Sequence, residues 1–307
     1  MLTTAETSTA IVTEPEIPDA QRWELLRALG AAVLTPPPGN AAPCEALGLP
    51  AQSGVEHTQV FVLSTPPHAA IHLGPEGQLG GEGLDRISGF WRALGLDAPE
   101  DADHLGALLM LYAELGEAET GAPDERGRAQ LLRARAALFH EHLWSWAPGY
   151  LTAVDGLGLE ATGAWAQLTA RALRGELARL GTAPLLPLAL RTAPAGLDPA
   201  DSFDETLDAL VAPVRCGMIL TYRDLVACGR QAGVGVRRGE RRYALKAMLL
   251  QDPVETLTWL AAHAQCWSQR HVRDSQTNND AGAWWAQRAR TTAATLAALA
   301  DQARTTA

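Results

Sequence analysis

Apolar side chains recur every three or four residues through most of this chain, which is the spacing of one face of an α-helix. Alanine and leucine dominate, and runs of β-branched residues are scarce, so the composition favours helix over strand. The widest stripe predicts a helix at the centre of the core and consists of Leu105, Leu108, Leu109, Tyr112 and Leu115. The sequence therefore predicts an all-α protein. It contains neither a dinucleotide-binding glycine motif nor a phosphate-binding loop.

Prolines and polar segments divide the predicted helices into two groups. Residues 1–18 are polar and are expected to form a disordered arm. Residues 19–182 form the first helical domain, and residues 183–202, with four prolines, form a Pro-rich linker. Residues 203–307 are expected to form a helical extension that packs on the first domain. The chain of 307 residues is long enough for one large or two modest domains.

Two helix boundaries are predicted from local signals. The segment Asp97-Ala98-Pro99-Glu100 is read as a capping box that begins the helix carrying Leu105. A second helix is predicted from Gln130 to Trp146 and is expected to stop at Pro148-Gly149.

The overall charge constrains the class of partner. The formal net charge is −10 and the pI is about 5.3, which disfavours general binding to nucleic acid and favours basic peptides. The N-terminus lacks the basic and apolar regions of a signal peptide, and no apolar run approaches the roughly 20 residues that span a bilayer. We therefore expect a cytoplasmic protein with no membrane insertion. The four cysteines form no C-x-x-C pair, so neither a zinc site nor a disulfide framework is predicted.

Residues 97–125 contain nine acidic residues and no lysine or arginine. Two interpretations remain open, a solvated acidic face or a docking surface for a cationic peptide. Within this stretch Asp103 and His104 are adjacent, and on a helix their side chains diverge by about 100°, so they cannot form a catalytic dyad with each other. Asp103 is expected to stabilise a first helical turn and His104 to pack as a structural histidine, or else the pair contacts a peptide. A hydrolase that uses His104 is the least favoured reading.

The aromatic segment at residues 139–148 contains two histidines and two tryptophans. Because His140 and His142 are two residues apart, a helix places them on nearly opposite faces, which argues against a metal site. His142 and Trp146 are predicted to be core residues. Trp144 is predicted to be an exposed aromatic anchor for a partner.

Basic residues gather in the C-terminal region around Arg237, Arg238, Arg241 and Arg242. Pairing with acidic segments of the same chain is the first interpretation. Docking of an acidic partner surface is the second, and a nucleic-acid-binding helix pair is the third.

The motifs occur in a recognisable order. Pro66-Pro67-His68 is followed by Gly77-Gln78-Leu79-Gly80-Gly81 and by Phe90-Trp91-Arg92-Ala93-Leu94-Gly95-Leu96. Next come the E-x-x-D-H-L element at residues 100–105 and the F-x-x-H-L-x-x-W-x-P element at residues 139–148. In this order and spacing, over about residues 20–180, the chain resembles the TorD/DmsD/NarJ family of molybdoenzyme-maturation chaperones. It departs from the family's usual pattern in having His68-Ala69-Ala70 after the two prolines, and in its C-terminal third.

The resemblance implies a TorD-like helical bundle, here with a helical C-terminal extension, and no catalysis. It also implies a chaperone that binds the catalytic subunit of a DMSO or nitrate reductase type of molybdoenzyme and, in many members, its twin-arginine leader. Carried over by motif, Glu100, Asp103 and His104 belong to the leader-binding region, to which we add Trp91 and Trp144 as peptide contacts. We expect no cofactor and no metal in the protein itself, and a monomer or a homodimer. The alternative function is a nucleic-acid-binding regulator that uses Arg237–Arg242.

Overall fold

The computed structural model describes residues 18–275 and 280–306, so the predicted arm lies outside the described residues except for Pro18. Over the described residues the regular structure is helical, and the only β-type pairing is an isolated bridge. The prediction of an all-α fold is confirmed. The helices are α1 (Asp19–Leu34), α2 (Ala41–Ala46), α3 (Gly54–His57), η1 (Thr58–Ser64), α4 (Ala69–Leu73), α5 (Gly81–Ala93), α6 (Leu105–Thr120), α7 (Glu125–Ala137), η2 (Leu138–Leu143), α8 (Ala147–Asp155), α9 (Glu160–Leu180), α10 (Leu188–Arg191), α11 (Phe203–Val211), α12 (Pro213–Cys216), α13 (Tyr222–Ala232), α14 (Arg241–Gln251), α15 (Pro253–Arg273) and α16 (Ala281–Thr306).

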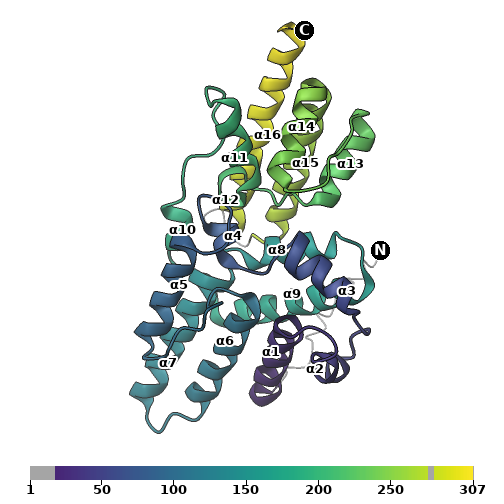
Figure 1. The fold of residues 1–307 in the computed structure, drawn as a ribbon. Helices are drawn as coiled ribbons and strands as arrows, with labels where there is room; N and C mark the ends of the chain where they lie inside the picture. Colours follow the sequence, from purple (N-terminus) through teal and green to yellow (C-terminus); the bar gives the residue numbers. More distant parts are fainter. Residues whose placement is uncertain (1–17, 276–279, 307) are drawn as a thin grey trace, which may run out of the picture.

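Helices α1 and α6 pack closely because glycines lie at their contact. A Cβ atom on Gly106 would lie 2.6 Å from the carbonyl oxygen of Gly30, and a Cβ on Gly116 would lie 2.5 Å from the ring of Trp23. The two contacts pair the end of α1 with the start of α6 and the start of α1 with the end of α6. The helices are therefore antiparallel, and they form the lower half of the molecule with α5, α7 and α9 (Figure 1).

A buried polar network joins four of these helices. The carboxylate of Glu176 on α9 pairs with Arg22 on α1 at 3.1 Å and accepts the hydroxyl hydrogen of Tyr112 on α6 at 2.7 Å. Arg135 on α7 donates to the same hydroxyl at 2.6 Å and to Glu119 at 2.7 Å. Because the Glu176 side chain is buried, these ion pairs and hydrogen bonds must offset the cost of removing its carboxylate from water.

Helices α11 to α16 form the upper half of the molecule (Figure 1). Its centre is the antiparallel hairpin of α15 and α16, in which Ser268 donates to the carbonyl oxygen of Ala286 at 2.9 Å. Gly217 has a φ of 72° and approaches α16 so closely that a Cβ atom would lie 2.3 Å from the amide nitrogen of Ala289. A larger residue cannot replace this glycine without moving α12 away from α16.

The two halves meet at a set of buried aromatic rings. Trp285 on α16 donates its indole N–H to the carbonyl oxygen of Ser145 at 2.7 Å. The ring of His72 on α4 stacks on that of Trp146, with centroids 4.9 Å apart. Burial lowers the pKa of His72 to about 3. The extension thus packs directly on the segment that carries the second sequence motif.

Residues 183–202 are not a continuous irregular linker, because they contain α10. The carboxylate of Glu141 accepts the backbone N–H of Leu188 at 2.6 Å, which ties this segment to η2. The division of the chain into two domains at these residues stays a prediction.

Two predicted helix boundaries are wrong. Asp97–Glu100 is not a capping box, because α6 begins at Leu105 with His104 at its N-cap. The helix predicted from Gln130 to Trp146 instead consists of α7 and the π-helix η2. Pro148 does not stop it, but lies in the first turn of α8, where a missing N–H costs nothing.

Candidate functional site

The carboxylate of Asp103 caps helix α4 rather than the helix that follows it. It accepts the Nδ1 hydrogen of His68 at 3.1 Å and the backbone N–H of Ala70 at 2.9 Å. Its side chain is buried, with an exposed fraction of 2% for the residue. Burial alone would raise the pKa of Asp103, but the hydrogen bonds from His68 and Ala70 outweigh it, and the pKa is lowered. The expectation that Asp103 stabilises its own helical turn is therefore wrong.

His104 caps helix α6. Its Nδ1 accepts the backbone N–H of Gly106 at 3.0 Å, so this nitrogen carries no hydrogen in the folded protein. Burial lowers the pKa of His104 to about 4, which keeps the ring neutral near pH 7. Because Nδ1 is already bonded and the ring is buried, His104 is a structural histidine and is not available as a general base.

A short bridge joins the Pro-Pro-His segment to the D-H-L segment. Ala69 donates its N–H to the carbonyl oxygen of Asp103 at 3.0 Å, and Leu105 donates to that of Pro67 at 2.7 Å. His68 and His104 face each other across this bridge with ring centroids 5.0 Å apart. The Pro-Pro-His and D-H-L segments, two of the elements that carried the resemblance, therefore form one joint between η1, α4 and α6.

Three acids at this joint point to solvent. Asp97, Glu100 and Asp101 are exposed, and over residues 18–275 and 280–306 their side chains make no ion pair or hydrogen bond. Other acids of the stretch are paired within the chain: Glu117 with Arg27, and Glu119 with Arg135. The acidic loop, defined here as Asp97, Glu100 and Asp101, thus carries charge that is free to bind a cation.

Exposed apolar side chains lie on the other chain segment of the joint. Val62 and Leu63, at the end of η1, are 57% and 74% exposed. They precede Pro66 and Pro67, which lead into the bridge with Asp103 and His104. The acidic loop precedes the bridge on one chain segment, and the apolar turn, defined here as Val62 and Leu63, precedes it on the other.

The two tryptophans predicted to contact a peptide lie in different surroundings. Trp91 is partly buried and donates its indole N–H to the carbonyl oxygen of Ala102 at 3.3 Å, so it supports the acidic loop from within. The prediction that Trp144 is an exposed anchor is wrong, because it is buried and stacks on Phe139 with centroids 5.7 Å apart.

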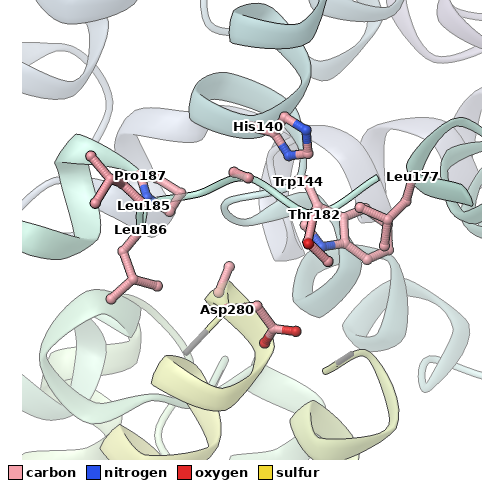
Figure 2. A pocket seen from close by; sticks show the side chains of 10 residues that line it. His140, Trp144, Leu177, Thr182, Leu185, Leu186, Pro187 and Asp280 are labelled. Atoms are coloured by element: carbon pink, nitrogen blue, oxygen red, sulfur yellow. The ribbon is translucent and has the colours of Figure 1, made fainter. Parts of the chain in front are cut away.

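A pocket of about 380 Å³, counted to its open mouth, lies beside Trp144 (Figure 2). The chain between α9 and α10 runs along it, and His140, Leu186 and Asp280 line different sides of it (Figure 2). It lies where η2, the end of α9 and the start of α16 meet. It is mostly apolar and separate from the acidic loop.

The predicted core residues of this segment are confirmed. His142 is buried against the ring of Phe90, and burial lowers the pKa of His142 to about 4. Trp146 is buried and donates to the carbonyl oxygen of His142 at 2.8 Å. Within the described part of the chain, no three His, Cys, Asp or Glu side chains come close enough to hold a metal ion.

The four arginines of the basic cluster lie in different surroundings: two are bonded within the chain and two are exposed. Arg241 turns inward and donates to the carbonyl oxygen of Leu220 at 2.9 Å, and Arg242 pairs with Asp208 at 2.5 Å and with Asp204 at 3.1 Å. Arg237 and Arg238 are exposed. The four arginines therefore do not form one continuous surface, which weakens the nucleic-acid reading.

No helix among the described residues is both long enough and apolar enough to cross a membrane. Neither a curated protein nor a solved structure matches the chain. The family model described as nitrate reductase delta subunit matches residues 49–151. This range contains the whole joint and the elements at residues 100–105 and 139–148. This match supports the resemblance of residues 49–151 to the TorD/DmsD/NarJ family of chaperones for molybdoenzyme maturation.

Proposed function

We propose that this protein binds the catalytic subunit of a molybdopterin oxidoreductase of the DMSO or nitrate reductase type, through the subunit's twin-arginine leader. Binding keeps the unfinished enzyme in the cytoplasm until its cofactor has been inserted. The observation that carries this proposal is the acidic loop at the joint, whose carboxylates are exposed and make no ion pair or hydrogen bond over the described residues.

The chemistry of the joint suits such a leader. A twin-arginine leader places two guanidinium groups before an apolar run, and each guanidinium can bind a carboxylate through two parallel hydrogen bonds. The acidic loop offers Glu100 and Asp101 for the arginines, while Val62 and Leu63 offer apolar area for the run. Of the residues proposed from the sequence, Glu100 keeps its role as a direct contact. Asp103, His104 and Trp91 become residues that hold the loop in place.

A titration of a synthetic twin-arginine leader peptide tests this proposal. The variant Glu100→Lys with Asp101→Lys should bind the peptide at least tenfold more weakly in calorimetry, because two attractive pairs become repulsive. The control is Glu45→Lys with Glu255→Lys, which makes the same charge change at exposed positions outside the joint.

The peptide itself supplies the second control. A leader with both arginines replaced by glutamine should bind the native protein weakly and should no longer distinguish the two double variants. Equal affinities of native protein and the Glu100→Lys, Asp101→Lys variant for the arginine peptide would contradict the proposal.

A further inference from the structure

Helix α14 has two apolar faces, and the fold uses only one. The inner face is buried in the core through Ala244, Leu245, Met248 and Leu249. The outer face carries Tyr243, Ala247 and Leu250, which follow each other at the i, i+4 and i+7 spacing of a second stripe. Tyr243 is 49% exposed and Leu250 is 71% exposed. A solvent-facing stripe of this kind is typical of a helix that packs against a partner.

This outer face forms one wall of an open groove. The opposite wall is the segment Gly235–Arg237, and the volume of the groove counted to its mouth is about 900 Å³. Val236 adds to the apolar floor. Seven residues of helix advance by about 10 Å, so the stripe is long enough for about two turns of a partner helix.

The rim of the groove is basic. The Arg237 guanidinium donates to the hydroxyl of Tyr243 at 2.7 Å and lies 5.7 Å from the centroid of its ring, which fixes the guanidinium at the edge of the apolar floor. Lys246 also lines the groove, and Arg238 is exposed next to Arg237. These charges stand out in a chain with a net charge of −10.

The backbone at the groove is not open to an added strand at Gly235. Its N–H donates to the side-chain oxygen of Gln251 at 2.9 Å, and its carbonyl oxygen accepts from the side-chain nitrogen of Gln251 at 2.9 Å. Both peptide groups are thereby satisfied, so side-chain packing rather than β-pairing must hold a partner there.

We propose that the groove between Gly235–Arg237 and α14 binds an amphipathic helix of a partner protein, with apolar side chains on one face and acidic side chains beside them. The partner's apolar residues pack on Val236, Tyr243, Ala247 and Leu250. Its carboxylates meet Arg237 and Arg238. This surface is independent of the leader site, which lies in the other half of the molecule.

The apolar floor distinguishes this partner from nucleic acid. Phosphate binding needs a row of free cations, yet Lys246 is already paired with Asp204 at 3.2 Å, and Arg241 and Arg242 are engaged elsewhere. An acidic helix gains both from burying the exposed leucine and from the charge of the rim.

The test uses a fluorescein-labelled peptide of about four helical turns, with leucines at i, i+4 and i+7 and glutamates elsewhere, titrated onto the full chain by fluorescence polarisation. Binding should weaken at least tenfold in Leu250→Asp and in Arg237→Glu. It should be unchanged in Arg230→Glu, an exposed control on α13. A peptide of the same composition with its leucines out of register, and one with lysines in place of glutamates, should each bind at least tenfold more weakly than the first peptide.

Three results would overturn the proposal. The first is peptide binding that Leu250→Asp and Arg237→Glu leave unchanged. The second is tight binding of a short DNA duplex that Arg237→Glu abolishes. The third is self-association of the native chain, seen by sedimentation, that Leu250→Asp abolishes, since the occupant would then be a second copy. Circular dichroism melting of each variant identifies any that fail to fold, and the conservative Leu250→Gln and Arg237→Gln then replace them.

Discussion

The imidazole of His68 donates its Nδ1 hydrogen to the carboxylate of Asp103, 35 residues later in the chain, at 3.1 Å. The same carboxylate accepts the N–H of Ala70, and the next residue, His104, caps α6. Two adjacent side chains thus fix the starts of two helices that are distant in the sequence. The acidic loop that we propose as the leader contact is held by this arrangement.

We expect Asp103→Asn to destabilise the fold by about 1–3 kcal/mol, because an amide accepts the two buried hydrogen bonds less well and places an N–H group beside donors. Denaturation by urea at pH 7 measures the change. Asp101→Asn, two residues earlier and exposed, should shift the free energy of unfolding by less than about 0.5 kcal/mol. Similar losses in both variants would show that the cap does not stabilise the fold.

The buried histidines should make the protein sensitive to acid. The pKa of His142 is about 4 in the fold and about 6.5 in an unfolded chain, so below pH 6.5 the unfolded state binds the proton first. The contribution of His142 to the free energy of unfolding is fully present above pH 6.5 and is lost as the pH falls toward 4. His104 and His271, both with pKa values of about 4, act in the same direction.

His142→Leu removes one such proton site and isolates its contribution. Between pH 6.5 and pH 4 the free energy of unfolding of this variant should fall less steeply than that of the native protein, by up to about 1.4 kcal/mol per pH unit. Urea denaturation at several pH values measures both slopes. Parallel slopes would mean that His142 is protonated in the fold, contrary to its burial.

Glu176→Gln should cost about 3 kcal/mol or more, because it leaves the buried charges of Arg22 and Arg135 without their shared carboxylate. The matched control is Glu160→Gln, an exposed residue in the first turn of the same helix. Thermal denaturation of the two variants should give a clearly lower midpoint for Glu176→Gln alone. An unchanged midpoint would show that the network is not required.

The apolar turn gives a prediction about the leader's hydrophobic run. Leu63→Asp should weaken binding of the leader peptide at least tenfold while leaving the melting temperature nearly unchanged, because Leu63 is mostly exposed. Val272→Asp introduces the same change at an exposed position on α15 and should bind normally. If Leu63→Asp binds as well as the native protein, the apolar run lies elsewhere, and the pocket beside Trp144 becomes the next surface to test.

Local sequence signals predicted the helices well where periodicity was strong. The stripe from Leu105 to Leu115 lies on α6, and Thr221 with Asp224 forms a capping box at the start of α13. The signals failed between residues 97 and 104, where acids and a proline suggested a helix start. There the real cap is a histidine whose ring bonds the N–H of Gly106, an uncommon cap that propensity does not favour.

The sequence by itself determined that the chain is helical, that it is acidic, and that residues 49–151 resemble a chaperone family, because these depend on spacing and composition. Only the tertiary structure decided which charges are free. Asp103 and Glu100 are three residues apart and both carry a carboxylate, yet one is buried against His68 and the other faces solvent. Arg237 and Arg242 differ in the same way, since Asp204 and Asp208 reach only Arg242. The partner of a side chain lies far away in sequence, so only the packing of the helices can assign it.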